Sequence, residues 1–326
     1  MADLGTIAIL AAFVAAAYGA VAAVVGHRTR SIALRTSSQR AVFATALLIS
    51  IAVAALVVAF VTRDFSIRYV AERSSRAMGL PLTIAAFYSG QAGSLLYWTW
   101  TLSLFSAIVV LQNRRRLLEL MPYVTAVLLG IQTFLLFMLG FVSSPFERLP
   151  FIPADGLGLN PLLDDGGMLV HPPMLLAGYM SWSIPFAFAV AALLTGRLDN
   201  EWVRATRRYA LAAWTILGLG NLLGAWWAYH VLGWGGYWGW DPVENAAFMP
   251  WLTGTAYLHS VMIQERRGML KLWNLALIIL SFNLAIFGTF IVRSGVIASV
   301  HSFAQSHVGP YYLVFLGVTL LFSLGL

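Results

Sequence analysis

The chain alternates long apolar runs with short polar or charged segments, and the lengths of these runs predict its architecture. A helix needs ~20 mostly apolar residues to cross the hydrocarbon core of a bilayer. Eight runs meet that requirement and a ninth is cut short: 4–25, 41–61, 85–111, 120–142, 173–194, 209–229, 242–263, 272–292 and 311–326. The pattern therefore predicts an all-α, polytopic transmembrane helix bundle that forms a single integral membrane domain over residues 1–326.

Composition supports a membrane protein. Hydrophobic residues make up 60% of the chain and charged residues 10%, with a mean hydropathy of +0.80, whereas roughly a quarter of the residues in soluble proteins are charged. The first apolar run has no basic region before it, so we expect it to be a retained span rather than a secretory signal.

The basic residues predict how the chain is oriented. Cytoplasmic loops of membrane proteins carry an excess of Lys and Arg. If the spans alternate in direction, the loops 26–40, 112–119, 196–208 and 264–271 share one side and hold fourteen of the twenty Lys and Arg residues. This side is predicted to be cytoplasmic, which places the N-terminus outside. The net charge of +7 is therefore a signal of topology, and we expect the lipid bilayer, not nucleic acid, as the partner of this charge.

An external loop rich in tryptophan and glycine is the strongest candidate for a binding site. The segment AWWAYHVLGWGGYWGWDPVENAAFMPW ends at Trp251 and contains six of the twelve tryptophans. Glycine lets a backbone approach closely and indole faces stack on flat ligands. Enrichment at membrane interfaces would explain two or three of these tryptophans, so we predict a large planar ligand. The residues predicted to hold it are Trp226, Trp227, Trp234, Gly235, Gly236, Tyr237, Trp238, Trp240, Asp241 and Glu244.

Two residues of this set also have a purely structural interpretation. Asp241, Pro242 and Glu244 have the spacing of a capping box at the start of a helix. This cap would fix the angle between the aromatic loop and the helix that follows.

Histidines on the same external side suggest iron ligation. Neutral imidazole is a common ligand of haem iron, and His171 and His301 are predicted as an axial pair. His171 precedes two prolines, which restrict the chain around it; an interfacial hydrogen bond is its alternative role. His307 is interpreted as a solvated loop residue. For His230, a ligand, a proton donor to a propionate and an interfacial residue all remain open.

His259 lies within the seventh predicted span, ~26 Å from its start at 1.5 Å per residue. Ionisable residues inside a bilayer usually face a functional site, so we predict that His259 binds a second, buried haem; a hydrogen bond between helices is the alternative. No other histidine lies within a predicted span, so either the second ligand comes from beyond Leu326 or the site is incomplete. Because the chain has no cysteine, any thiol chemistry at the external site requires a partner.

Four sequence blocks together resemble one family. They are LNPLLDDGGMLVHPPMLLAGY, WGGYWGWDPVENAAFMPWL, YLHS and RSGVIASVHSFA, and in this order they resemble the first half of the CcmF family, the haem lyase subunits of bacterial cytochrome c maturation. The resemblance implies a multi-pass protein of the bacterial inner membrane with a periplasmic haem site built from the loops 143–172, 226–251 and 293–310. His171 and His301 would bind the periplasmic haem iron, and His259 a permanent b-type haem.

The same resemblance implies an activity. Haem, bound transiently, would present its vinyl groups to the reduced cysteines of a CxxCH segment in apocytochrome c, and catalysis would consist mainly of positioning. The membrane haem would supply electrons from quinol. The implied partners are apocytochrome c, the haem chaperone CcmE, and CcmH and CcmI. Two alternatives remain: a haem transporter, suggested by small and polar residues in the spans (Gly218, Gly220, Asn221, Gly224 and Asn283), and a quinol-oxidising cytochrome b subunit.

Overall fold

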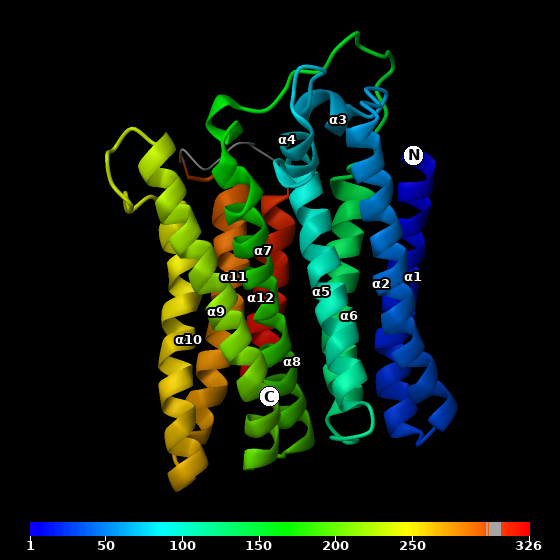
Figure 1. The fold of residues 1–326 in the computed structure, drawn as a ribbon. Coiled ribbons are helices and arrows are strands. Elements are labelled where there is room, and N and C mark those ends of the chain that lie inside the picture. The colour runs from blue at the N-terminus through cyan, green and yellow to red at the C-terminus, as the bar shows by residue number, and fades with distance from the viewer. Residues whose placement is uncertain (298, 300–307) are drawn as a thin grey trace.

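The fold is a bundle of long helices that run side by side (Figure 1). A computed structural model describes residues 1–297, 299 and 308–326. Within these residues there is no strand, and one isolated β-bridge joins Ile67 to Arg148. The predicted all-α class is therefore confirmed.

Each predicted apolar run forms a helix. The long or paired helices are α1 (Ala2–Arg28), α2 (Ile32–Val61), α5 (Gln91–Asn113), α6 (Met121–Phe137) continued by η2 (Met138–Val142), α7 (His171–Ser181) followed by α8 (Ser183–Thr195), α9 (Asn200–Val231), α10 (Pro242–Arg267), α11 (Lys271–Ser294) and α12 (Gly309–Leu324). Shorter helices occupy the connections: α3 (Arg68–Arg73), α4 (Leu80–Ala85), η1 (Ala86–Tyr88), η3 (Pro161–Leu163) and η4 (Gly166–Leu169).

In the part of the chain that the structure describes, seven helical segments are long and apolar enough to cross a membrane. Of the other two predicted spans, α12 is shorter, with 16 residues, and α10 carries polar side chains along its length, including Thr253, Thr255 and His259. The chain is a multi-pass membrane protein, whereas its eight complete spans stay a prediction.

Small residues allow the helices to pack closely. A Cβ added to Gly19 of α1 would lie 2.7 Å from the Cβ of Ala41 in α2 and 2.6 Å from Cδ1 of Leu129 in α6. Such small residues are typical of helix interfaces in membranes, where backbones approach closely. The α1–α2 hairpin packs against α5 and α6. The helices α7 to α9 lie next in the bundle, and α10 to α12 complete it (Figure 1).

The connections segregate to the two ends of the bundle. The connections 29–31, 114–120, 196–199 and 268–270, which with the adjoining helix ends hold the fourteen Lys and Arg residues counted above, lie at one end, and the segments 62–90, 143–170 and 232–241 lie at the other (Figure 1). This grouping agrees with the alternating crossings on which the predicted orientation depends. The placement of the N-terminus outside stays a prediction.

The long connection 143–170 is tied to the segment that contains α3. The backbone N–H of Arg76 donates to Oδ1 of Asp155 over 2.8 Å, and the guanidinium Nε of Arg76 donates to the carbonyl of Ala154 over 3.0 Å. The N–H of Arg76, followed by that of Gly156, holds the pKa of the exposed Asp155 carboxyl below its usual value. These contacts position the chain that leads to α7.

Candidate functional site: a cavity around His171

His171 is the first residue of α7, and Pro172 and Pro173 occupy the first turn. Proline suits this position because the first N–H groups of a helix have no partner within the helix and the fixed φ of proline is already helical. The boundary between loop and helix is therefore where the sequence predicts it. It gives the imidazole a rigid backbone attachment.

Helix α9 sets the orientation of the His171 ring. Nδ1 of His171 lies 2.9 Å from the carbonyl oxygen of Gly220. A carbonyl only accepts hydrogen bonds, so Nδ1 carries the hydrogen, and in the neutral ring the lone pair is then on Nε2. Metal-binding histidines are commonly fixed in this way, with one ring N–H donating to a carbonyl while the other nitrogen binds the metal.

One turn further along α9, Gly224 gives the ring its space. A Cβ at Gly224 would lie 2.5 Å from Cε1 of His171, closer than side-chain carbons approach. The ring of Trp227 lies 5.6 Å from that of His171 between centroids, with 55° between their planes. Three positions on one face of α9 therefore supply a hydrogen-bond acceptor, a gap and an aromatic wall.

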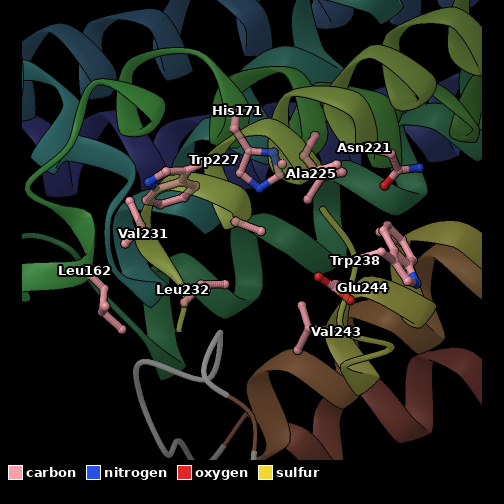
Figure 2. A pocket seen from close by; sticks show the side chains of 14 residues that line it. Leu162, His171, Asn221, Ala225, Trp227, Val231, Leu232, Trp238, Val243 and Glu244 are labelled. Carbon is pink, nitrogen blue, oxygen red and sulfur yellow. The ribbon is translucent and has the colours of Figure 1, made fainter. Parts of the chain in front are cut away.

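The imidazole points into a cavity of about 610 Å³ (Figure 2). The carboxylate of Glu244 also points into it (Figure 2). The lining consists of Leu162, His171, Leu175, Asn221, Gly224, Ala225, Trp227, Ala228, Val231, Leu232, Trp238, Val243, Glu244 and Ala247.

Three N–H donors in this lining are buried without a hydrogen-bond partner among the described residues. They are Nδ2 of Asn221 and Nε1 of Trp227 and Trp238. Buried donors are rarely left unsatisfied, because each loses its water without compensation. A ligand with acceptor groups would satisfy them. The lining is thus chemically suited to a haem, with an imidazole for the iron, apolar and indole walls for the macrocycle, and N–H donors for acceptor groups brought into the cavity.

The tryptophan-rich segment contributes part of its side chains to this cavity. Of the ten residues that the sequence predicts to hold the ligand, Trp227, Trp238 and Glu244 line it. The other predicted residues, which are absent from the lining among the described part of the chain, are Trp226, Trp234, Gly235, Gly236, Tyr237, Trp240 and Asp241.

Several of those other aromatic side chains hold the loop together. Tyr237 stacks on Tyr229 at the end of α9, with centroids 4.5 Å apart and planes 12° apart. Trp234 donates through Nε1 to the carbonyl of Gly236 over 3.0 Å. The loop therefore packs on itself and on the end of α9.

The predicted capping box at the start of α10 is confirmed. Oε2 of Glu244 accepts from the N–H groups of Gly239 and Asp241, over 3.0 and 3.1 Å. Oδ2 of Asp241 accepts from the N–H of Val243 over 2.9 Å and from the hydroxyl of Ser299 over 2.7 Å. These bonds join the aromatic loop to α10 and to the segment after α11.

The other histidines lie in different surroundings. His259 is exposed on α10, with Nδ1 2.8 Å from the carbonyl oxygen of Thr255 in its own helix. His230 is exposed at the end of α9, with Nδ1 2.7 Å from the carbonyl oxygen of Trp226. His301, predicted as an axial ligand, and His307, predicted as a solvated loop residue, lie outside the described residues.

Comparison with known proteins identifies the family. Residues 88–297 match the family described as "Cytochrome C assembly protein". Because this match covers more than half of the chain, the chain belongs to that family. The helical bundle and the cavity described above are thus those of a member of this family.

Several relatives with similar sequences are CcmF proteins. The "Cytochrome c-type biogenesis protein CcmF" of Haemophilus influenzae is 46% identical over 281 residues, which cover 85% of this chain and 43% of the relative. CcmF of Pseudomonas aeruginosa is 49% identical over 260 residues, with 79% and 40% covered. CycK of Rhizobium meliloti is 44% identical over 302 residues, with 93% and 45% covered. The chain thus spans less than half the length of these relatives.

A solved structure agrees with this assignment. The structure titled "Cytochrome c Heme Lyase CcmF" has a TM-score of 0.83 and 33% sequence identity to this chain, and the match covers 99% of this chain and 50% of the other. The resemblance to the CcmF family is therefore confirmed, and the half-length coverage fits the prediction that this chain corresponds to half of a longer member.

Proposed function

We propose that this chain holds haem at the His171 cavity and presents it for attachment to apocytochrome c, the role of a haem lyase. The observation that carries the proposal is the support of His171 by α9, with the Gly220 carbonyl on Nδ1 and the space left by Gly224 beside the ring. A histidine with only a structural role needs the hydrogen bond, but it does not need an apolar cavity around it.

His301 is the second ligand of the periplasmic haem iron in this proposal. The aromatic loop completes the haem site from the side of α10. Further haem-contacting residues in this proposal, in addition to those that line the cavity, are Trp226, Trp234, Gly235, Gly236, Tyr237, Trp240 and Asp241. The capping box supports this role because it fixes the position at which the loop joins the start of α10.

The protein acts by positioning. Haem supplies the vinyl carbons, and the two reduced cysteines of the CxxCH segment of apocytochrome c supply the sulfurs; each thiol adds across a vinyl group, with its hydrogen going to the neighbouring carbon. Holding two reactants in a productive geometry removes much of the entropic barrier without a side chain acting as nucleophile. His171 and the cavity walls keep the porphyrin in one orientation and keep water from its faces.

His259 serves a second, permanent b-type haem within the membrane. Its ring is exposed on α10 with Nδ1 directed to Thr255, so Nε2 carries the lone pair and faces away from this chain's own helix. The opposite ligand belongs to a part of the full-length protein that this chain does not include. Electrons from quinol pass through this site, because the periplasmic iron must be reduced.

The cellular setting follows the same proposal. The chain lies in the bacterial inner membrane with its N-terminus in the periplasm. Haem arrives from the chaperone CcmE, and CcmH and CcmI deliver reduced apocytochrome c.

The test compares two histidines at the same end of the bundle. His171→Ala is expected to abolish holocytochrome c formation in a strain that depends on this protein, whereas His230→Ala is expected to retain it, because His230 is exposed and lines neither cavity. Equal holocytochrome yields from the two variants would contradict the proposal. Haem uptake into vesicles that persists in His171→Ala would instead favour the transporter.

A further inference from the structure

A second cavity of about 840 Å³ adjoins the first one. The two cavities share His171, Leu175, Trp227 and Val243 in their linings, so His171 stands in the wall between them. The second cavity extends toward the start of α5 and the end of α11. Its lining there includes Gln91, Ser94 and Arg293.

Arg293 is a buried cation. Only 7% of its surface is exposed, and it lies in α11, one of the helices apolar enough to cross a membrane. Charged side chains in such helices are costly, and they usually face a site of function. The sequence places Arg293 at the start of the predicted external loop 293–310 but assigns it no role, so its burial in a cavity wall is a finding of the structure.

Helix α5 holds the guanidinium in one orientation. One terminal nitrogen donates to the carbonyl of Gln91 over 3.1 Å and the other to the hydroxyl of Ser94 over 2.8 Å. The Cζ atom lies 4.9 Å from the ring centroid of Trp98, which provides a cation–π contact. All three of these groups belong to α5, and together they fix the orientation of the guanidinium at the cavity wall.

We propose that Arg293 binds a propionate carboxylate of the haem that His171 ligates. The inference rests on the proposed function and adds the recognition of the porphyrin edge. A fixed guanidinium is well suited to a carboxylate, because its planar donors match the two oxygens and the ionic hydrogen bonds are strong. Arg293 and His171 line the same cavity, so a ligand bound through its iron at His171 has an edge within this cavity.

The consequence is a defined orientation of the substrate. Haem carries its two propionates on one edge and its vinyl groups away from that edge. Anchoring the propionate edge between α5 and α11 leaves the vinyl groups toward the cavity of Trp238, where the aromatic loop lies. Arg293 is in this sense a specificity-determining residue: it decides which edge apocytochrome c meets.

The competing explanation is that Arg293 only joins α11 to α5. The two roles differ in what they require of the ligand. A purely structural arginine supports all porphyrins alike, whereas a carboxylate anchor distinguishes haem from haem dimethyl ester, in which both propionates are uncharged.

The experiment measures the affinities of ferric haem and of ferric haem dimethyl ester for the full chain in lipid nanodiscs, by absorbance titration. Arg293→Gln is expected to weaken haem binding at least about tenfold and ester binding less than about twofold. Arg293→Lys, which keeps the charge, is expected to recover part of the loss. Arg148→Gln serves as the control for a lost positive charge, because Arg148 is exposed and paired with Asp3.

The outcomes separate this inference from the function on which it rests. Equal losses for haem and ester in Arg293→Gln overturn the carboxylate anchor while leaving the His171 site intact. If Arg293→Gln does not fold, Arg293→Lys decides: a change in the ratio of haem to ester affinity supports the anchor, and an unchanged ratio overturns it. Haem binding that does not depend on His171 overturns the proposed function itself.

Discussion

The surroundings of His171 and His259 differ, although both histidines are candidates for iron ligation. At His171 the acceptor for Nδ1 comes from another helix, α9, and Gly224 of that helix leaves space for the ring. At His259 the acceptor is the carbonyl of Thr255 one turn earlier in the same helix, and the ring is exposed on the surface of this chain. One site is assembled within the chain, and the other needs a further protein surface.

This difference indicates how independent the two sites are. A ligand oriented by its own helix is present as soon as α10 forms, and its site is completed by whatever covers that face. A ligand oriented by a neighbouring helix depends on tertiary packing, so small changes in α9 alter it.

Replacement of His259 should remove one haem without affecting the other site. His259→Ala is expected to eliminate the membrane haem from the purified protein, because no other side chain on that turn offers an imidazole, while the affinity of the His171 site for added haem changes less than about twofold. Pyridine haemochrome spectra count the haems, and titration measures the affinity.

His230→Ala is the control, since His230 is also exposed and bonded to its own helix. An equal haem content in His259→Ala and His230→Ala would contradict the assignment of His259.

Replacement of Gly224 should damage the His171 site through a neighbouring helix. The added methyl of Gly224→Ala would lie 2.5 Å from Cε1 of His171, so the ring must move, and haem affinity is expected to fall about 10–100-fold, the range for lost support of a metal ligand. Gly130→Ala is matched to it, because Gly130 is also helical and has no atom within 4 Å of the added carbon. Similar affinities in both variants would show that the gap is not needed.

A smaller effect is expected from the loop before α7. A Cβ at Gly167 would lie 2.4 Å from Cγ of Trp227, whereas a Cβ at Gly166 would meet no atom within 4 Å. Gly167→Ala should displace the indole wall and weaken haem binding about two- to tenfold, the value of an aromatic contact. Gly166→Ala should have no effect. Haem titration of the two variants measures both affinities. A greater loss of haem affinity in Gly166→Ala than in Gly167→Ala would contradict the role of the Trp227 indole as a cavity wall.

The smallest effect concerns the helix cap. Asp241→Ala is expected to destabilise the first turn of α10 by about 1 kcal/mol, because the N–H of Val243 loses its acceptor. Hydrogen exchange at the backbone amides of residues 243–245 should accelerate, and these amides should exchange more slowly in Asp241→Asn, which keeps an acceptor oxygen, than in Asp241→Ala. Exchange that is unchanged in both variants would exclude the cap as a support of the aromatic loop.

The sequence predicts the helices and the cap because both are local. Apolar runs of sufficient length locate every long helix, and the spacing of Asp241 and Glu244 identifies the capping box. His171 is also found locally, from the two prolines after it. These features depend on residues within a few positions of one another.

The cavity is not local, and the sequence leaves most of it open. His171 and Gly220 are separated by 49 positions, and no local pattern pairs them. Gly220 and Gly224 attract attention only as small residues for helix packing, although their spacing of four places both on one face of α9. That spacing, opposite a histidine at a helix start, is the signal that could have found them.

The sequence also does not show which tryptophans line the cavity. Their number and their glycine spacing indicate a flat ligand, but these cannot separate side chains that line the cavity from those that hold the loop. Trp227 and Trp238 line the cavity, whereas Trp234 bonds within the loop. Whether a tryptophan lines the cavity or bonds within the loop depends on how the loop folds back on α9.

Chemical rescue tests whether His171 binds the haem iron. The chain and its His171→Gly variant would be loaded with ferric haem, and their visible and electron paramagnetic resonance spectra would be recorded with and without added imidazole. We expect His171→Gly to lose the low-spin spectrum of the unmodified chain and imidazole to restore it, because the free ring occupies the space of the missing side chain. A His171→Gly variant with an unchanged low-spin spectrum before imidazole is added would contradict the account.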